Sequence, residues 1–286
     1  MNMNNKNWVS VWGNAVSIAE HHPEAYAKYI TLRYPVYIPF DGDTLRFTFD
    51  NYCGSEAVTV TRATVSAATS PVYEKMPLAC PCKKETICDI TFSKNESVTM
   101  EAHQTAVSDP VSFPVKKGMT LTVSLYFADF TLMQSAVLVT GPLSKGFFFL
   151  GDQTHADALP MDTTKTTNWF YFLSNIELMT AEENHTVICY GDSITAGAWP
   201  DYLTLLARQN PDNHTAFIRR ATSGSRVLRQ YECITYDSYG LKGTNRFPHE
   251  IPTTGADTVI IQQGINDIIH PIGIETNPFR PMSDLP

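Results

Sequence analysis

Residues 1–182 show a strict alternation of apolar and polar side chains. The pattern is clearest in segments 45–49 (Leu-Arg-Phe-Thr-Phe) and 119–127 (Met-Thr-Leu-Thr-Val-Ser-Leu-Tyr-Phe). Because successive side chains of a β-strand point to opposite faces of its sheet, this spacing predicts antiparallel strands that are half-buried. The chain is therefore expected to begin with an antiparallel β fold.

Further short runs of β-forming residues lie in the same region, separated by turn-forming clusters such as Asp41-Gly42-Asp43 and Lys117-Gly118. Several short strands at such spacing are typical of two-sheet β folds. The prediction for residues 1–182 is a β-sandwich of the jelly-roll kind. The runs are Ala57–Val65, Thr86–Phe92, Val98–Glu101, Val111–Val115 and Trp169–Leu178.

Residues 183–286 follow a different pattern, in which an apolar run leads into a glycine-containing turn. The run Thr186–Tyr190 is short, continuous and β-rich, as buried parallel strands are. It is followed by Gly191-Asp192-Ser193 and then by a helical pattern from Pro200 that stops at Asn210-Pro211. Ser193 is therefore predicted on a strand-to-helix turn, with its hydroxyl exposed and with backbone N–H groups nearby that can bind an oxyanion.

Two later segments repeat the arrangement of an apolar run followed by a polar loop. Ala216–Ile218 leads to a loop that contains Gly224, and Thr258–Gln262 leads to a loop that contains Asn266. Glycine allows a backbone N–H to approach a tetrahedral intermediate closely, and a side-chain amide is a good oxyanion donor. Loops that contain Ser193, Gly224 and Asn266 thus follow three predicted strands, in this order along the chain.

A serine, a glycine and an asparagine, in this order at three strand ends, resemble the motifs of the SGNH (GDSL-type) hydrolases. The resemblance implies that Ser193 is a nucleophile, and that its N–H, the N–H of Gly224 and the amide of Asn266 form the oxyanion hole. It also implies a three-layer α/β/α domain with a parallel sheet at residues 183–286, and hence an α+β chain of two domains, 1–182 and 183–286. Segments 45–54, 108–111 and 121–126 resemble an accessory β-domain of one bacterial branch of the family, and Arg246-Phe247 also resembles that branch.

The implied reaction is hydrolysis of a carboxylic ester through an acyl-enzyme, without a cofactor or metal. The implied substrate is a small-molecule ester of a short acyl group or a carbohydrate O-acetyl ester. The family's catalytic base lies on a late Asp-x-x-His motif, whereas here 20 residues follow Asn266 and their one histidine is His270. The chain is therefore expected to be a fragment with a C-terminally incomplete hydrolase domain, and His270 is the alternative base.

Two other functions are alternatives to ester hydrolysis. An inactive relic whose β-domain binds glycans is the alternative that stays open. A nucleotide-binding protein is disfavoured, because the chain contains neither Gly-x-x-x-x-Gly-Lys nor Gly-x-Gly-x-x-Gly.

Several residues near the motifs receive a structural interpretation. Asp192 supports the site, and Asp192 and Asp267 are expected to hydrogen-bond within their own turns. Arg226, beside Gly224, is expected to be solvated or ion-paired, with contact to an anionic substrate as the alternative. His155 and His249 are expected in polar loops at the surface.

Composition limits the partners and the location. The formal net charge of −8 argues against nucleic acid, whose binding requires a basic face. No apolar run approaches the ~18–20 residues of a membrane span, and residues 1–12 lack the features of a secretory signal, so a cytoplasmic location is expected. The six cysteines are expected to be free thiols, because Cys80-Pro81-Cys82 and Cys88 lack a partner pair at zinc-site spacing. The sequence leaves the oligomeric state open.

Overall fold

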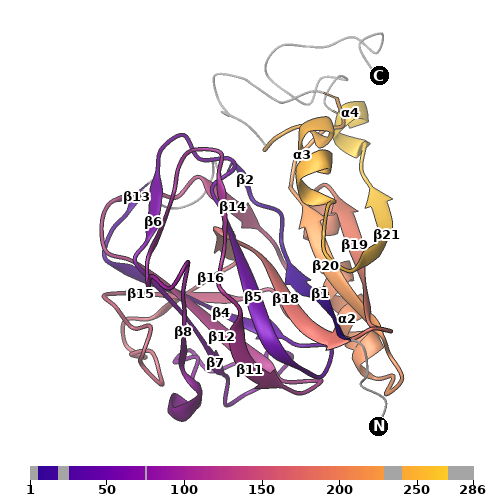
Figure 1. The fold of residues 1–286 in the computed structure, drawn as a ribbon. Helices are drawn as coiled ribbons and strands as arrows, with labels where there is room; N and C mark the ends of the chain where they lie inside the picture. Colours follow the sequence, from indigo (N-terminus) through magenta and orange to yellow (C-terminus); the bar gives the residue numbers. More distant parts are fainter. Residues whose placement is uncertain (1–5, 19–25, 75, 229–239, 270–286) are drawn as a thin grey trace.

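A computed structural model describes residues 6–18, 26–74, 76–228 and 240–269 of the chain, and most of these residues lie in antiparallel β-sheets (Figure 1). Two large sheets face each other. The first contains, in spatial order, β1 (Lys6–Gly13), β18 (Leu173–Ala181), β5 (Gly42–Asp50) and β10 (Thr105–Val107), and β11 (Val111–Val115) also pairs with β5. The second contains β16 (Lys165–Thr167), β15 (Gly146–Leu150), β4 (Ile30–Tyr37), β12 (Thr120–Phe127), β7 (Arg62–Ala67) and β8 (Cys88–Ile90).

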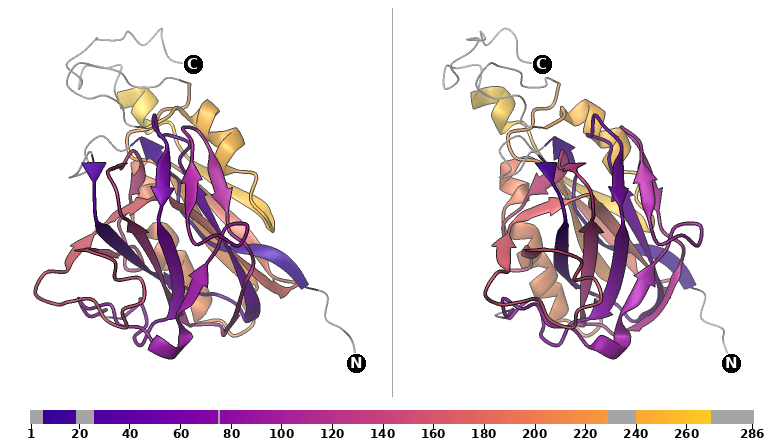
Figure 2. Two further views of the ribbon diagram at one scale, coloured as in Figure 1. Left: turned by 60° about the vertical axis from the view of Figure 1, so that its left-hand side comes forward. Right: turned by 90° about the vertical axis from the view of Figure 1, so that its left-hand side faces the viewer.

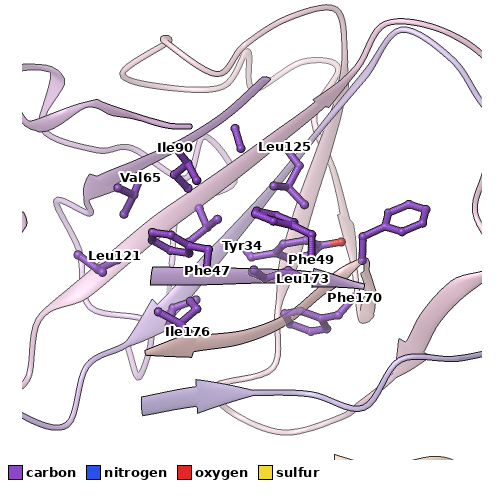
Figure 3. Packing of buried hydrophobic residues seen from close by; sticks show 14 of the residues in the cluster. Tyr34, Phe47, Phe49, Val65, Ile90, Leu121, Leu125, Phe170, Leu173 and Ile176 are labelled. Carbon is purple, nitrogen blue, oxygen red and sulfur yellow. The ribbon is translucent and has the colours of Figure 1, made fainter. Parts of the chain in front are cut away.

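The core of the molecule lies between these two sheets (Figure 3). Phe47 and Phe49 of β5 are fully buried there, as are Leu121 and Leu125 of β12. Burial of one such side chain contributes about 1.5–3 kcal/mol. The predicted strands at 45–49 and 119–127 are confirmed, because the alternating apolar residues of both segments reach the same core.

Strand β12 differs from the sequence prediction in one respect, since it is buried on both faces rather than half-buried. Its outer face carries small hydroxyl residues, which loops from elsewhere in the chain cover. Arg33, fully buried on the neighbouring strand β4, donates hydrogen bonds to Ser124 Oγ at 2.9 Å and to the carbonyls of Cys80 and Ala156 at 3.2 and 2.7 Å. These bonds satisfy the polar groups that the covering loops bury.

Smaller elements complete the antiparallel part. The predicted β-rich runs 57–65, 86–92, 98–101, 111–115 and 169–178 all contain strands. The small sheets are β13 (Thr131–Leu132) with β3 (Tyr26–Ala27), β17 (Trp169–Tyr171) with β14 (Ser135–Leu138) and β2 (Ser17–Ile18), and β6 (Val58–Val60) with β9 (Val98–Met100); η1 (Lys84–Thr86) is a single 3₁₀ turn.

A parallel sheet lies beside the antiparallel part, with β1 next to its strand β20 (Figure 1 and Figure 2). Its strands are β20 (Thr215–Ala221), β19 (His185–Gly191) and β21 (Ala256–Gln262), in that spatial order. Their carboxyl ends point toward α3 (Gly243–Glu250) and α4 (Ile265–Ile269), whereas α1 (Ser193–Ala196) and α2 (Trp199–Arg208) follow β19. The predicted helix after Pro200 is thus confirmed as α2.

The predicted α+β chain with a three-layer α/β/α domain is wrong. Among the described residues the sheets are mostly antiparallel, the parallel sheet has three strands, and the longest helix, α2, has ten residues. The physical reason lies in what covers the parallel sheet. Arg219 of β20 points to α1 and α2, but Arg220, on the other face, donates to the carbonyls of Asn14 and Ser174. Strand β1 and the loop after it therefore lie against the face where a second helix layer was expected, and the start of β18 reaches it through Ser174 and Asn175.

Neither a membrane-spanning helix nor a metal-binding cluster is found among the described residues. No helix there is long and apolar enough to cross a membrane. No group of three or more histidine, cysteine, aspartate or glutamate side chains is arranged there to hold a metal ion. Of the cysteines within these ranges, Cys80, Cys82, Cys88 and Cys189 are free thiols, and Cys233 lies outside the described residues.

Candidate functional site

Ser193 lies at the point where β19 gives way to α1. Asp192 precedes it as the N-cap residue, and its Oδ1 accepts a hydrogen bond from the backbone N–H of Ile194 at 3.1 Å. Asp192 is fully buried, whereas Ser193 is exposed. The turn therefore fixes the backbone of Ser193 and leaves its hydroxyl open to solvent.

Gly191 allows this turn to pack tightly against β21. A Cβ atom at Gly191 would lie 2.2 Å from the carbonyl oxygen of Gln262 and 2.4 Å from Thr195 Oγ1. Neither distance is possible for a real side chain. The side-chain oxygen of Gln262 also accepts a hydrogen bond from Thr195 Oγ1 at 3.0 Å. The end of β19 is therefore packed between the end of β21 and helix α1.

The loop after β20 turns back toward the same point. The N–H of Thr222 donates to the carbonyl of Gly191 at 3.1 Å. Gly224 follows with a φ of +75°, a conformation that side chains disfavour and glycine adopts freely. The glycine predicted from sequence thus occupies a position where the backbone conformation itself calls for glycine.

The loop after β21 lies directly on the loop that carries Gly224. The buried Asn266 donates from Nδ2 to the carbonyl of Ser225 at 3.0 Å, and the carboxylate of Asp267 accepts from the N–H of Val227 at 2.9 and 3.1 Å. Within the described residues, one of the two Asn266 amide protons is used. The structure therefore brings the loops of Ser193, Gly224 and Asn266 to one end of the parallel sheet.

Arg246 of α3 binds the strand ends from one face of the sheet. This residue is 1% exposed. Its guanidinium donates to the carbonyls of Gly191 and Arg220 at 3.2 and 3.0 Å and to Ser225 Oγ at 2.9 Å. Glu250 accepts at 3.0 and 2.8 Å. Burial lowers the pKa of Arg246, but the charge of Glu250 and its hydrogen bond, with smaller contributions from Tyr190 and Cys53, together outweigh burial, and the pKa is raised.

Arg219 holds the opposite face. It donates to the carbonyls of Thr195 and Gly197 at 3.2 and 3.1 Å, and it pairs with Asp201 of α2 at 2.7 Å. Its remaining bond, at 2.9 Å, goes to Ser144 Oγ. The short helix that begins at Ser193 is therefore tied to strand β20 by a buried cation.

Two buried polar atoms beside Ser193 have no hydrogen-bond partner among the described residues, namely Asp192 Oδ2 and Thr222 Oγ1. Burial raises the pKa of the Asp192 carboxyl, and the hydrogen bonds from the backbone of Ile194 and of Asp192 itself, with the charge of Arg246, offset this only in part. Asp192 therefore caps the turn with one carboxylate oxygen, and within the described residues its other oxygen accepts no hydrogen bond.

The histidines do not all lie where the sequence suggested. His249 was expected in a surface loop but belongs to helix α3, half-buried, where its Nε2 lies 2.8 Å from Asp50 Oδ2 and its ring stacks on Tyr52 at 3.8 Å. His155 is exposed and pairs with Asp89 at 3.1 Å. His270 lies outside the described residues. Within the described ranges, no histidine hydrogen-bonds to Ser193.

Sequence reasoning missed the roles of Arg219, Arg246 and His249. The spacing of Arg246 and Glu250, four residues apart, is a signal for a helical ion pair, but nothing in it points to the strand ends. Arg226, expected to be solvated or ion-paired, is buried.

Comparisons with known proteins add little to this geometry. No family model matches the chain, and no curated protein does. Among solved structures the chain is similar to a family two carbohydrate esterase from Cellvibrio japonicus, at 11% sequence identity over 92% of this chain and 68% of that one, with a TM-score of 0.24. A likeness at this level carries no argument about fold or activity, so any functional conclusion depends on the site.

Proposed function

We propose that the chain is a serine ester hydrolase in which Ser193 is the nucleophile, with the N–H groups of Ser193 and Gly224 and the amide of Asn266 as oxyanion donors. One observation supports this assignment above the others. Asn266 hydrogen-bonds to the residue next to Gly224, and the Gly224 loop hydrogen-bonds to the strand end that carries Ser193. The loops of Ser193, Gly224 and Asn266 are thus linked by hydrogen bonds, which supports a common site for a nucleophile and oxyanion donors such as acyl transfer requires.

The reaction follows from these roles. Ser193 Oγ attacks the ester carbonyl carbon, and the carbonyl electron pair moves onto oxygen, where the three donors stabilise the negative charge. Collapse of this intermediate expels the alcohol and leaves an acyl-enzyme, which water then hydrolyses to the free acid. A general base must take the Ser193 proton within about 2.6–3.2 Å of Oγ. No histidine in the described ranges does so, and the proposal assigns the base to none of them.

The substrate class that we propose is an ester of a short acyl group, including O-acetyl esters of carbohydrates. This part rests on the resemblance of the three motifs to the SGNH hydrolases. The open position of Ser193, on the outside of the turn, agrees with attack on an ester that is presented from solvent.

The test is covalent labelling of the chain 1–286 with a fluorophosphonate probe, followed by mass spectrometry of the adduct. We expect modification of Ser193 in the wild type and none in Ser193→Ala. The matched control is Ser223→Ala, which removes a neighbouring hydroxyl and is expected to label normally. An adduct that persists in Ser193→Ala, or a wild-type chain that reacts no faster than denatured protein, would overturn the proposal.

A further inference from the structure

Arg246 connects the separate pieces of the proposed site. Its guanidinium reaches the last residue of β19, the carbonyl of Arg220 near the end of β20, and the hydroxyl of Ser225 in the loop between β20 and α3. A guanidinium presents its donors in a fixed plane, so the three acceptors are held in a defined relative geometry. An ammonium group could not hold them in the same way.

Each of these acceptors is close in sequence to a proposed catalytic group. Gly191 lies two residues before Ser193, and Ser225 directly follows Gly224. The carbonyl of Ser225 also accepts the hydrogen bond of Asn266. Arg246 thus fixes the segments of Ser193 and Gly224 directly and that of Asn266 through Ser225. Because misplacement of catalytic groups by about 1 Å can cost on the order of 100-fold in rate, such a residue is expected to affect the reaction strongly.

Helix α3, which carries Arg246, is itself fixed by the antiparallel part of the molecule. One turn after Arg246, His249 pairs with Asp50 of β5 and stacks on Tyr52. The carbonyl of Glu250 accepts from Arg220 Nε at 3.2 Å. The position of α3 therefore depends on strands that belong to the first half of the chain.

We propose that Arg246 is a positioning residue, which sets the relative places of Ser193, Gly224 and Asn266, and that the antiparallel part holds Arg246 in place through the contact of His249 with Asp50. This inference rests on the proposed function. It gives the antiparallel part a role in the reaction without any contact between that part and the substrate.

The test compares Arg246→Lys with Arg33→Lys in the full chain. Arg33 is also a fully buried arginine with several hydrogen bonds, but it lies on the outer face of β4, away from the parallel sheet. Fluorophosphonate labelling of Ser193 is measured over a range of probe concentrations. We expect the limiting rate to fall at least tenfold in Arg246→Lys, with the half-saturating concentration within twofold of wild type. Arg33→Lys is expected to label as wild type does, after correction for the unfolded fraction.

Asp50→Asn tests the second half of the proposal and remains informative if Arg246→Lys does not fold. We expect it to lower the limiting labelling rate about two- to fivefold. Equal rates in wild type, Arg246→Lys and Asp50→Asn would overturn the inference, as would an equal loss in Arg33→Lys.

A second readout separates this inference from the proposed function. In a Ser193→Cys background, alkylation of Cys at position 193 by iodoacetamide reports the geometry of the turn and needs no esterase activity. We expect Arg246→Lys to change the alkylation rate at least threefold. If the wild type is never phosphonylated but the alkylation rates differ, the proposed function fails and the positioning role stands; if the alkylation rates are equal, the positioning role fails.

Discussion

At the scale of single residues, Asp192 shows how the turn before Ser193 is built. One carboxylate oxygen caps α1, and the other is buried without a partner among the described residues. A buried polar atom that lacks a hydrogen bond costs about 1–3 kcal/mol. The turn therefore gains a helix cap from Asp192 but also carries the cost of a buried charge.

Asp192→Asn is expected to separate these two effects. The pKa of the Asp192 carboxyl is higher in the folded protein than in the unfolded chain. This group therefore contributes most to the stability of the folded wild type below its unfolded pKa, and the contribution is lost as the pH rises through its folded pKa. Asparagine keeps the cap and has no charge to bury. We expect its melting temperature to equal or exceed that of wild type at pH 7, with the advantage smaller at pH 4, as measured by calorimetry.

Asp192→Ala is the control, because it removes the cap as well as the charge. It is expected to lose about 1 kcal/mol relative to Asp192→Asn. A lower melting temperature for Asp192→Asn than for wild type at pH 7 would show that the buried carboxylate has a partner that stabilises it.

At the scale of elements, strand β20 joins two different parts of the molecule through two neighbouring arginines. Arg219 binds α1, α2 and the loop of Ser144 on one face of the sheet. Arg220 binds Asn14, Ser174 and Asn175 on the other. Adjacent residues of a strand point to opposite faces of the sheet. Arg219 therefore binds the helices α1 and α2, whereas Arg220 binds the antiparallel part.

Loss of the Asp201 carboxylate is expected to destabilise the α1 and α2 side. Asp201 accepts from Arg219, from the N–H of Leu143 and from Ser144 Oγ, and it is buried. Removing one partner of a buried ion pair leaves the other charge uncompensated, which costs about 3–5 kcal/mol. Urea unfolding of Asp201→Ala should show this loss, whereas Asp212→Ala, at an exposed position, should unfold as wild type does. Similar midpoints for the two variants would contradict the expectation.

Many of the elements were predictable from the sequence, because strands and turns are encoded in local patterns. The alternation of 119–127 and the Gly-Asp-Ser turn at 191–193 are examples, but β1, β4, β15 and α3 were not predicted. What could not be predicted depends on contacts between distant segments. Arg246 meets Gly191 across 55 positions, and His249 meets Asp50 across 199. The packing of β1 against the parallel sheet also depends on segments far apart in the chain, and for this reason the helix layer expected from the family resemblance was wrong.

At the scale of the whole molecule, the two predicted halves share an extensive polar contact. The boundary proposed after residue 182 falls between β18, which ends at Ala181, and β19, which begins at His185. Across it, Ser10 donates to the carbonyl of Thr254 at 2.9 Å and accepts from Thr186 Oγ1 at 2.7 Å through its own carbonyl. Such directional contacts fix one half relative to the other.

The contact of His249 with Asp50 makes part of this interface sensitive to pH. Burial opposes protonation of His249, but the hydrogen bond and charge of Asp50, helped by Glu250 and opposed by Arg220, outweigh burial and raise the pKa. The contact of protonated His249 with Asp50 therefore stabilises the folded protein fully below the pKa of histidine in the unfolded chain, about 6.5. This stabilisation is lost as the pH rises through the pKa of His249 in the folded protein. We expect the difference in melting temperature between wild type and Asp50→Asn to be larger at pH 6 than at pH 9. A difference that is constant over this range would mean that His249 stays neutral.

The pairing of β1 with β18 has a consequence for how the chain is made. Lys6 pairs with Ala181, and Gly13 pairs with Asn175. A ribosome adds about 5–20 residues per second, so the roughly 160 residues between these strands take about 8 to 30 s to synthesise. During that time β1, with Trp8, Val9 and Val11, has no partner strand, and an unpaired apolar strand readily joins another chain. We therefore expect β1 to be exposed to aggregation during translation, until β18 has been made and pairs with it.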